Sequence, residues 1–444
     1  MLFCSCDVPD YDTTPSIMTP AARIQTTMEL LGYIERSPVP MDTTVADYMR
    51  ARRYIGSKDR ANVAERVYNL MRARARLGWW LEKTGQEDTY RNRVIFWLAL
   101  SELKSGVFEI GDLFDDSKHG CDRLTKDEHK LAAFLKEKTL IDPGMPAEIK
   151  TECPPDHEDR LRAYFNDSFE MEMGAMIDGA TLDLRVNLAK ASREDVQAAL
   201  KKDRVYTDPT PYSVSGLRAQ NKAYLAQTKA FIKGWVDIQD EGSQLIAQIC
   251  NVQPGMQVLD YCAGAGGKTL ALADAMRGKG RIVAMDTDSR RLEKAKPRLK
   301  RAGVSDIIEL RALSEERSRK WLKRQKGTFD VVLADVPCSG SGTWRRNPDT
   351  RWRTYGPGLE ELLPVQADIL DRTTKAVQSG GHLVYATCSL FPEENERQIE
   401  EFLKRHDDFK LVEFDLPFAK GSYMRLTPHR HNTDGFFAAV LQHL

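Results

Sequence analysis

The sequence predicts an α/β protein whose C-terminal half is a mostly parallel, doubly wound sheet, preceded by a small α+β segment and an all-helical segment. Beyond Gly234, short apolar runs typical of strands alternate with charged stretches typical of helices. A glycine-rich turn follows the first of these runs, and a cysteine-containing turn follows each of two later runs. We expect strands over residues 257–261, 281–286, 307–310, 329–335, 382–387 and 435–441.

The first half of the chain divides at proline-rich breaks. From residue 21 to about residue 140, apolar residues recur at spacings of three and four, which indicates helices. Prolines and glycines near residues 142–146 and 153–155 mark a boundary. Residues 182–188 have the pattern of a strand, and residues 193–201 that of a helix capped by Ser192. We therefore predict a flexible tail over 1–20, a helical domain over 21–145, a small α+β domain over 146–236 and the sheet domain over 237–444.

Composition limits the classes of function. The chain has 65 Lys and Arg and 65 Asp and Glu among 444 residues, so a polyanion would need a local basic patch. The 8 cysteines form no Cys-x-x-Cys pair, which favours a reducing compartment, the cytoplasm, and gives no sign of a metal site. The longest apolar run, 94–100, is too short to span a membrane, and no signal peptide is recognisable. Because the first residues are unpatterned, translation starting at Met18 is an alternative to Met1.

The glycine-rich turn, residues 262–269, joins the strand at 257–261 to a helix expected over 270–276. Glycines at such a turn let backbone N–H groups approach a ligand, and the helix amino end favours negative charge. Asp286 ends the next strand, where a carboxylate can accept hydrogen bonds from ribose hydroxyls. The turn therefore predicts a site for a nucleoside-type cofactor. The alternative is a glycine-rich turn that binds nothing.

Two better-known phosphate motifs do not fit this turn. Gly267-Lys268-Thr269 resembles the end of a P-loop, but Cys262 stands where the first glycine of that loop belongs. The dinucleotide pattern fails because Thr269 stands where its third glycine or alanine belongs.

Two cysteine turns, Asp335-Val336-Pro337-Cys338-Ser339 and Thr387-Cys388-Ser389, each follow an apolar strand. Either thiol alone would more often be a small core residue. Because the carboxyl ends of parallel strands meet at the ligand-binding rim of an open sheet, we expect both thiols to face one substrate.

Two thiols, a carboxyl group and a nucleoside cofactor suit the methylation of cytosine. Carbon 5 of cytosine is a poor nucleophile until a thiolate adds to carbon 6. A carboxyl group at nitrogen 3 would stabilise the charge that develops on the ring. A second thiol could assist the later expulsion of the first.

The catalytic half resembles the RsmB/Nop/Sun family of RNA 5-methylcytosine methyltransferases, which share a class I (Rossmann-like) methyltransferase core and use S-adenosylmethionine. The matching segments are 231–234, 239–244, 260–269, 286 with 291–292, 335–342 with 345–349, 385–389 with 392–396, and 434–437. The resemblance implies that Cys388 adds to carbon 6, that Cys338 aids product release and that Asp335 contacts the base. The cofactor contacts that it implies are Cys262, Ala263, Gly264, Ala265, Gly266, Gly267, Lys268, Asp286, Arg291 and Asp335.

The chain departs from the family pattern at two places. Gly264-Ala265 stands where members commonly have Ala-Pro. After the third strand, the acid expected near the adenine is replaced by Leu313-Ser314-Glu315-Glu316, and any residue of 314–316 could take its place.

The first half is similar to the NusB-like helical domain and the small RNA-binding subdomain of bacterial ribosomal members of the family. The matching segments are 53–72 and 182–187. The resemblance therefore implies two RNA-binding parts and favours small-subunit (16S) ribosomal RNA as the substrate. The oligomeric state has no signal in the sequence, and a monomer is the default expectation.

Three local clusters of basic residues could bind RNA. The clusters at 72–76 and 294–301 could equally be solvated helix faces, and we favour that interpretation for the cluster at 294–301. The third interleaves Trp344 and Trp352 with Arg345, Arg346, Arg351 and Arg353, a composition suited to stacking an unpaired base.

Three other functions remain open at this point. A transfer RNA cytosine methyltransferase would share every motif. A DNA cytosine methyltransferase would use the Pro-Cys thiol, Cys338, as its nucleophile. A non-catalytic RNA-binding assembly factor would keep the fold without the reaction.

Overall fold

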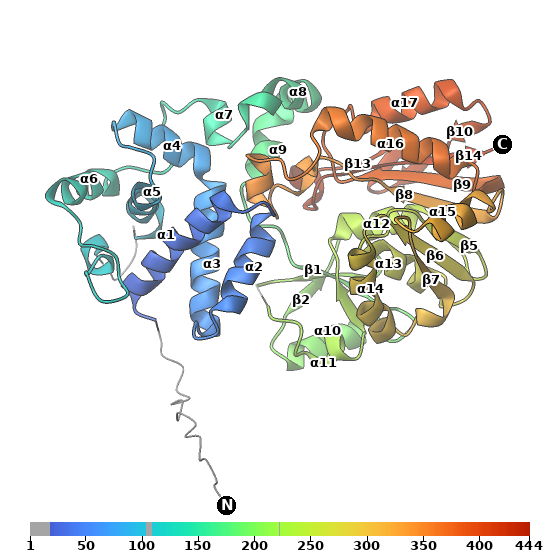
Figure 1. The fold of residues 1–444 in the computed structure, drawn as a ribbon, viewed down its shortest axis with the longest axis horizontal. Coiled ribbons are helices and arrows are strands. Elements are labelled where there is room, and N and C mark those ends of the chain that lie inside the picture. The colour runs from blue at the N-terminus through green and yellow to red at the C-terminus, as the bar shows by residue number, and fades with distance from the viewer. Residues whose placement is uncertain (1–17, 104–108, 222) are drawn as a thin grey trace, which may run out of the picture. The chain divides into compact units, whose positions relative to one another are not determined.

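The computed structural model describes residues 18–103, 109–221 and 223–444 (Figure 1). The chain forms two compact units, one of residues 1–153 with 347–349 and one of 154–346 with 350–444. Cys4, Cys6 and most of the predicted tail lie outside the described residues. In the part of the chain that is described, no helix is both long and apolar enough to cross a membrane.

The first unit is helical, as the three-and-four spacing predicts. The hydroxyl of Thr19 caps its first helix by accepting a hydrogen bond from Ala22 N at 3.1 Å. A single apolar core joins the helices, and Trp80 and Phe96 are among its largest buried side chains. The elements are α1 (Pro20–Arg36), α2 (Met41–Ala51), α3 (Ser57–Arg72), α4 (Arg74–Lys83), α5 (Tyr90–Trp97), η1 (Leu98–Glu102), η2 (Ile110–Leu113), α6 (Lys126–Lys136) and α7 (Ala147–Lys150).

One arginine of the basic cluster at 72–76 is structural. The Arg76 side chain is buried, and its Nε donates to the fully buried carboxylate of Glu152 at 2.8 Å. Glu152 also accepts from the backbone N–H groups of Ala75 and Arg76 at the start of α4. Arg76 is therefore not available to an RNA phosphate.

The second unit begins with short helices and a small antiparallel sheet. The sheet has the strand order β2-β3-β1-β4. Ser192 caps α10 as predicted, accepting from Asp195 N at 3.1 Å. The elements are α8 (Pro155–Phe165), η3 (Asn166–Ser168), α9 (Phe169–Ala175), β1 (Asp183–Val186), α10 (Arg193–Lys202), β2 (Thr207–Pro209), β3 (Gly216–Ala219), α11 (Lys229–Ile232) and β4 (Val236–Ile238).

The large sheet follows and confirms the predicted α/β fold. Its path is β10-β14-β9-β8-β5-β6-β7, and β13 pairs with β14. The pairs from β9 to β7 are parallel, whereas β14 is antiparallel to its neighbours. The elements are α12 (Glu241–Ile249), β5 (Gln257–Asp260), α13 (Gly267–Ala275), β6 (Arg281–Asp286), α14 (Ser289–Ala302), η4 (Ser305–Ile307), β7 (Ile308–Ala312), α15 (Glu316–Lys323), β8 (Phe329–Asp335), η5 (Ser341–Thr343), η6 (Pro348–Arg351), α16 (Leu359–Thr374), β9 (Val377–Thr387), α17 (Glu396–Arg405), β10 (Phe409–Leu411), β11 (Phe414–Leu416), β12 (Ala419–Gly421), β13 (Met424–Leu426), α18 (Pro428–His431) and β14 (Phe436–His443).

Alternate residues of the central strands enter two separate cores. On β8, Val331 and Leu333 pack with α12, α13 and α14, whereas Val332 and Ala334 pack with α15, α16 and α17. A strand buried on both faces needs apolar residues at every position, which explains why these strands read as continuous apolar runs. The sheet is therefore the middle layer of three.

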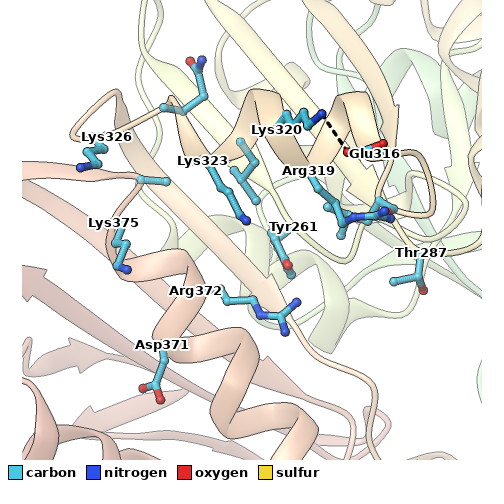
Figure 2. Close-up of a pocket in the computed structure, with 14 residues that line it drawn as sticks. Tyr261, Thr287, Glu316, Arg319, Lys320, Lys323, Lys326, Asp371, Arg372 and Lys375 are labelled. Atoms are coloured by element: carbon cyan, nitrogen blue, oxygen red, sulfur yellow. Dashed lines mark hydrogen bonds and ion pairs between the residues drawn. The ribbon is translucent and has the colours of Figure 1, made fainter.

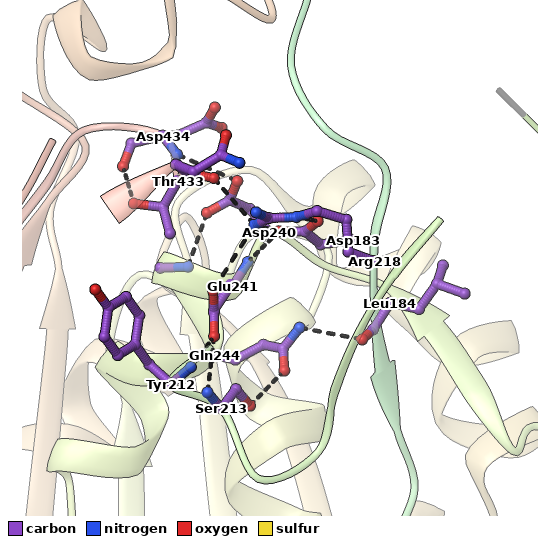
Figure 3. A network of polar contacts seen from close by, with 12 residues as sticks. Asp183, Leu184, Tyr212, Ser213, Arg218, Asp240, Glu241, Gln244, Thr433 and Asp434 are labelled. Atoms are coloured by element: carbon purple, nitrogen blue, oxygen red, sulfur yellow. Dashed lines mark hydrogen bonds and ion pairs between the residues drawn. The ribbon is translucent and has the colours of Figure 1, made fainter. Parts of the chain in front are cut away.

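A buried polar network ties the small sheet to the large one (Figure 3). Arg218 of β3 donates to Asp183 of β1 at 2.7 Å, and Asp183 accepts from the N–H of Glu241 at the start of α12. The Glu241 carboxylate in turn accepts from the N–H groups of Tyr212 and Ser213, both at 2.7 Å. Segment 239–244 therefore acts as the joint between the two sheets of this unit.

Candidate active site

Three carboxylates end three adjacent strands of the large sheet. They are Asp260 on β5, Asp286 on β6 and Asp335 on β8. The chain runs outward from β5 in both directions, first through β6 and β7 and then through β8 and β9. The crevice beyond β5 and β8 is therefore the topological switch point, where open α/β sheets bind their ligands.

The glycine turn after β5 has the conformation that its composition predicts. Gly264 and Gly266 have φ values of 57° and 77°, a region that side chains rarely adopt. Gly264 N donates to the Asp286 carboxylate at 2.8 Å, which fastens the turn to the end of β6. The Arg291 guanidinium lies over this junction, 3.6 Å from Asp286, and a Cβ on Gly264 would come within 2.6 Å of it.

The turn fits a nucleoside-type cofactor. Gly267 and Lys268 begin α13, so the helical hydrogen-bond ladder leaves their N–H groups without an intrahelical acceptor. Asp260 is fully buried, and burial raises its pKa to about 7. One oxygen of Asp260 accepts from Thr269, while the other has no partner among the described residues. A buried acceptor without a partner is consistent with a site that a ligand completes.

Lys268 is paired with the carboxylate predicted to contact the base. Its Nζ lies 2.7 Å from Asp335 Oδ2. Burial alone would lower the pKa of Lys268, but the charge of Asp335 and the hydrogen bond to it raise that pKa above its usual value. Lys268 therefore stays cationic, and its charge also acts on Cys388. The sequence assigned Lys268 only to the cofactor, and nothing local to the sequence reveals a partner 67 positions away.

The structure brings the two predicted thiols together. The sulfur atoms of Cys338 and Cys388 lie 3.4 Å apart, both cysteines are free, and both are partly exposed. Strand register explains this meeting, because Asp335 of β8 stands opposite Ala386 of β9 and each cysteine follows within three residues. The separation exceeds the ~2.05 Å of a disulfide, so the sulfurs are in hydrogen-bond contact only.

A close backbone contact braces the thiol turns. Gly342 N donates to the carbonyl of Cys388 at 2.9 Å, and the Gly342 carbonyl accepts from Gly435 N at 2.8 Å. A Cβ on Gly342 would lie only 2.1 Å from the Gly435 carbonyl oxygen. Glycine is therefore required where the turns after β8 and β9 meet the segment before β14.

Gly342→Ala should unfold more easily and methylate more slowly than the unchanged protein. The methyl group would force apart backbone that cannot retreat, at a cost of about 3 kcal/mol. Thermal unfolding and methyl-transfer rates measure both effects. Gly174→Ala is the control, because a Cβ there meets nothing within 4 Å; equal behaviour of the two variants would contradict the bracing role.

The predicted base-stacking cluster is wrong for three of its members. Trp344 is only 2% exposed, lying parallel to His157 and edge-on to Phe391. Arg345 is buried against Asp434 at 2.7 Å. Arg351 is buried and donates to the carbonyl of Met176 at 3.0 Å. The alternation of tryptophan with arginine predicts that Trp344 lies on the surface. In the structure, Trp344 is instead buried against aromatic neighbours.

A pocket of about 980 Å³ opens beside the end of β7, between α15 and α16 (Figure 2). Of the residues 314–316 that could replace the missing acid near the adenine, Glu316 lines this pocket together with Thr287 and Leu313. Glu316 is paired with Lys320 at 2.8 Å, and Glu315 with Arg317 at 2.6 Å.

The comparisons with known proteins agree with this geometry. Residues 247–442 match the family model described as 16S rRNA methyltransferase RsmB/F. The chain is 37% identical over 290 residues to the probable ribosomal RNA small subunit methyltransferase B of Synechocystis sp., covering 64% of this chain and 62% of that protein. It is 28% identical over 401 residues to ribosomal RNA small subunit methyltransferase B of Yersinia pseudotuberculosis, covering 87% and 91%. The chain thus spans about three fifths of the length of the first relative and most of the second.

Solved structures show the same architecture. A protein designated PH0851 matches with a TM-score of 0.75 and 27% identity, covering 96% of this chain and 99% of that one. A methyltransferase homolog protein from Pyrococcus horikoshii matches with a TM-score of 0.57 and 28% identity, covering 68% and 100%. The glycine turn and the paired thiols both lie within residues 247–442, the part of the chain that is similar to the RsmB/F family of 16S rRNA methyltransferases.

Proposed function

We propose that the protein transfers a methyl group from S-adenosylmethionine to carbon 5 of a cytosine in 16S ribosomal RNA. The observation that carries this proposal is the meeting of two free thiols, 3.4 Å apart, beside an Asp335–Lys268 pair at the switch point of the sheet. Few reactions need two thiols and a carboxylate around one ring, and methylation at carbon 5 of a pyrimidine is one of them.

Cys388 is the nucleophile of this mechanism. Its thiolate forms a bond from sulfur to carbon 6, and the electrons of the 5,6 double bond make carbon 5 nucleophilic. Lys268 is the cation whose charge interacts with that of Cys388. The carboxyl group of Asp335 holds the ring at nitrogen 3 and stabilises the charge that develops there.

Release of the product breaks the bond between the Cys388 sulfur and carbon 6. The proton on carbon 5 leaves to a base, the 5,6 double bond re-forms, and the sulfur of Cys388 departs as thiolate. Cys338 is in hydrogen-bond contact with that sulfur and stabilises it as it leaves.

The glycine turn at 262–268, Asp286 and Arg291 would hold S-adenosylmethionine. When bound, this cofactor supplies an electrophilic methyl group. Asp286 already orders the turn through Gly264 N and the next helix through Asp288 N, and each of its oxygens keeps a further lone pair for a ribose hydroxyl.

Asp286→Ala should weaken the binding of S-adenosylmethionine by roughly ten- to a hundredfold, because it removes charge-assisted hydrogen bonds to the cofactor and to the turn. Calorimetric titration with S-adenosylhomocysteine measures this loss. Asp306→Ala, which changes an acid of η4 outside the turn, is the matched control. Unchanged affinity in Asp286→Ala would remove this residue from the cofactor site.

Domains outside the active site would bind the RNA. We assign this role to the helical domain over 21–145 and to the small α+β domain over 146–236. The target cytosine must leave its helix or be unpaired, since its ring edge is hidden in a duplex. Within the third basic cluster, Arg353 remains exposed. We expect the monomer to work in the reducing cytoplasm.

The function is tested by incubating the purified protein with labelled S-adenosylmethionine and either 16S ribosomal RNA or a transfer RNA pool. Bisulfite sequencing then locates the modified base. We expect 5-methylcytosine in 16S ribosomal RNA only. Label in transfer RNA would redirect the proposal, and binding of RNA without any transfer of label would identify a non-catalytic assembly factor.

A further inference from the structure

A buried carboxylate, Glu394, lies behind both thiol turns. It is fully buried in the turn between β9 and α17. From the sequence, Glu394 stands out only as a member of segment 392–396, because its contacts involve residues as many as 55 positions away.

Glu394 holds the turn that carries Cys338 by two bonds. One carboxylate oxygen accepts from the backbone N–H of Ser339 at 2.8 Å, and the other accepts from the Ser339 hydroxyl at 2.5 Å. Gln366 of α16 donates to Glu394 at 2.9 Å and to the carbonyl of Pro337 at 3.0 Å, which fixes the residue on the other side of Cys338.

The same carboxylate holds the turn that carries Cys388. The Ser389 hydroxyl donates to Glu394 and itself accepts from Phe391 N at 3.0 Å. One side chain thus touches the residue after each cysteine. The 3.4 Å separation of the sulfurs depends on these shared contacts.

The charge of Glu394 is not cancelled by a neighbour. In the ranges 18–103, 109–221 and 223–444, it forms hydrogen bonds but no ion pair. Its four donors are neutral, so no cation offsets the charge of a carboxylate at this buried place, where electrostatic effects are strong.

We propose that Glu394 is a positioning residue that sets the division of labour between the two thiols: its buried negative charge keeps Cys338 protonated, so that Cys388 is the sulfur that attacks the base. The attack of Cys388 on the base rests on the proposed function. The order in which the two thiols ionise does not, and it can be measured without RNA or cofactor.

The electrostatics of the site agree with this assignment. The hydrogen bond with Cys388, burial and the negative charges of Cys388 and Glu394 together raise the pKa of the Cys338 thiol well above its usual value. Lys268, the cation of the site, acts on Cys388 through its own charge. A protonated Cys338 is also what product release requires, because only a thiol can donate a hydrogen bond to the departing sulfur.

The test is alkylation of the full-length protein by iodoacetamide across pH 6 to pH 10, with each cysteine followed by peptide mass spectrometry. Both cysteine residues are partly exposed, so a small alkylating reagent is used. In the unchanged protein, Cys388 should react at lower pH than Cys338. In Glu394→Gln, which removes the charge at nearly constant shape, the rate ratio of Cys338 to Cys388 at pH 8 should rise at least about tenfold.

Glu393→Gln is the matched control. It removes the same charge one residue earlier, from a side chain paired with Arg397 at 3.6 Å that contacts neither thiol turn. Its alkylation ratio should match that of the unchanged protein. Glu394→Asp, which keeps the charge but shortens the reach, should keep Cys338 unreactive while slowing methyl transfer, a combination that loss of packing alone would not produce.

Each outcome decides the inference. A ratio in Glu394→Gln equal to that in Glu393→Gln overturns it, even if methyl transfer is normal. If Glu394→Gln does not fold, the pH order of alkylation in the unchanged protein decides, and earlier reaction of Cys338 overturns the inference. Absence of methyl transfer in the unchanged protein, with the alkylation order as expected, would instead reject the proposed function and leave the ionisation order standing.

Discussion

Cys388→Ala should abolish methyl transfer, reducing turnover by at least about a thousandfold, because nothing else at the rim can activate carbon 5. Cys338 lies 3.4 Å away, but in the proposed reaction it assists the departure of the Cys388 sulfur and does not attack the base. Transfer of labelled methyl groups to 16S ribosomal RNA measures the loss. Binding of S-adenosylhomocysteine should be retained, which would show that the site has not collapsed.

Cys338→Ala should behave in the opposite way. The bond between Cys388 and carbon 6 still forms, but its breakage loses the hydrogen-bond donor that stabilises the departing sulfur. A covalent protein–RNA adduct should therefore accumulate and appear as a slower band on a denaturing gel.

The double variant Cys338→Ala with Cys388→Ala is the control, and it should give no adduct. Should the adduct instead form in Cys388→Ala and vanish in Cys338→Ala, the roles of the thiols would be exchanged. The chain would then use the nucleophile of the DNA cytosine methyltransferases.

Asp335→Asn should reduce the rate of methyl transfer by about a hundred- to a thousandfold. Asparagine keeps the shape but loses both the charge that pairs with Lys268 at 2.7 Å and the carboxyl group at the ring. Single-turnover rates separate this chemical effect from RNA binding.

Lys268→Met should also reduce the rate of methyl transfer, but by less than Asp335→Asn. It removes the cation that interacts with both Asp335 and Cys388. Glu401→Gln, which changes an exposed acid of α17, should leave the rate unchanged and serves as the control. The two substitutions at the pair should be less than additive when combined, because they break one interaction. Full additivity would show that Asp335 and Lys268 act independently.

The strands of the large sheet were predictable because burial on both faces leaves a continuous apolar run. The predicted bounds of β6 and β8, 281–286 and 329–335, match the structure. Strand β9 begins at Val377, five residues earlier than predicted. Its start contains Gly380 and Gly381 and pairs with β8 through an irregular register, so no apolar pattern marks it.

The site was predictable only where its residues follow strands directly. The glycine turn follows β5 and the two thiols follow β8 and β9, so the local sequence was enough to predict all three. The partners of these residues come from elsewhere in the fold: Lys268 meets Asp335, and Glu394 meets Ser339. Trp344 shows the converse, because its neighbours in sequence indicate a surface role while its neighbours in space bury it.

The contact between Gly342 and Gly435 has a consequence for the order in which the enzyme is made. Strand β14, which pairs with the strand leading to Cys388, comes from residues 436–443, and Gly435 secures the turn that carries Cys338. A nascent chain still attached to the ribosome at this segment has both thiols but lacks the backbone that aligns them. The two thiol turns should therefore reach their aligned geometry only after residues 435–443 have been added to the chain and β14 has paired with β9.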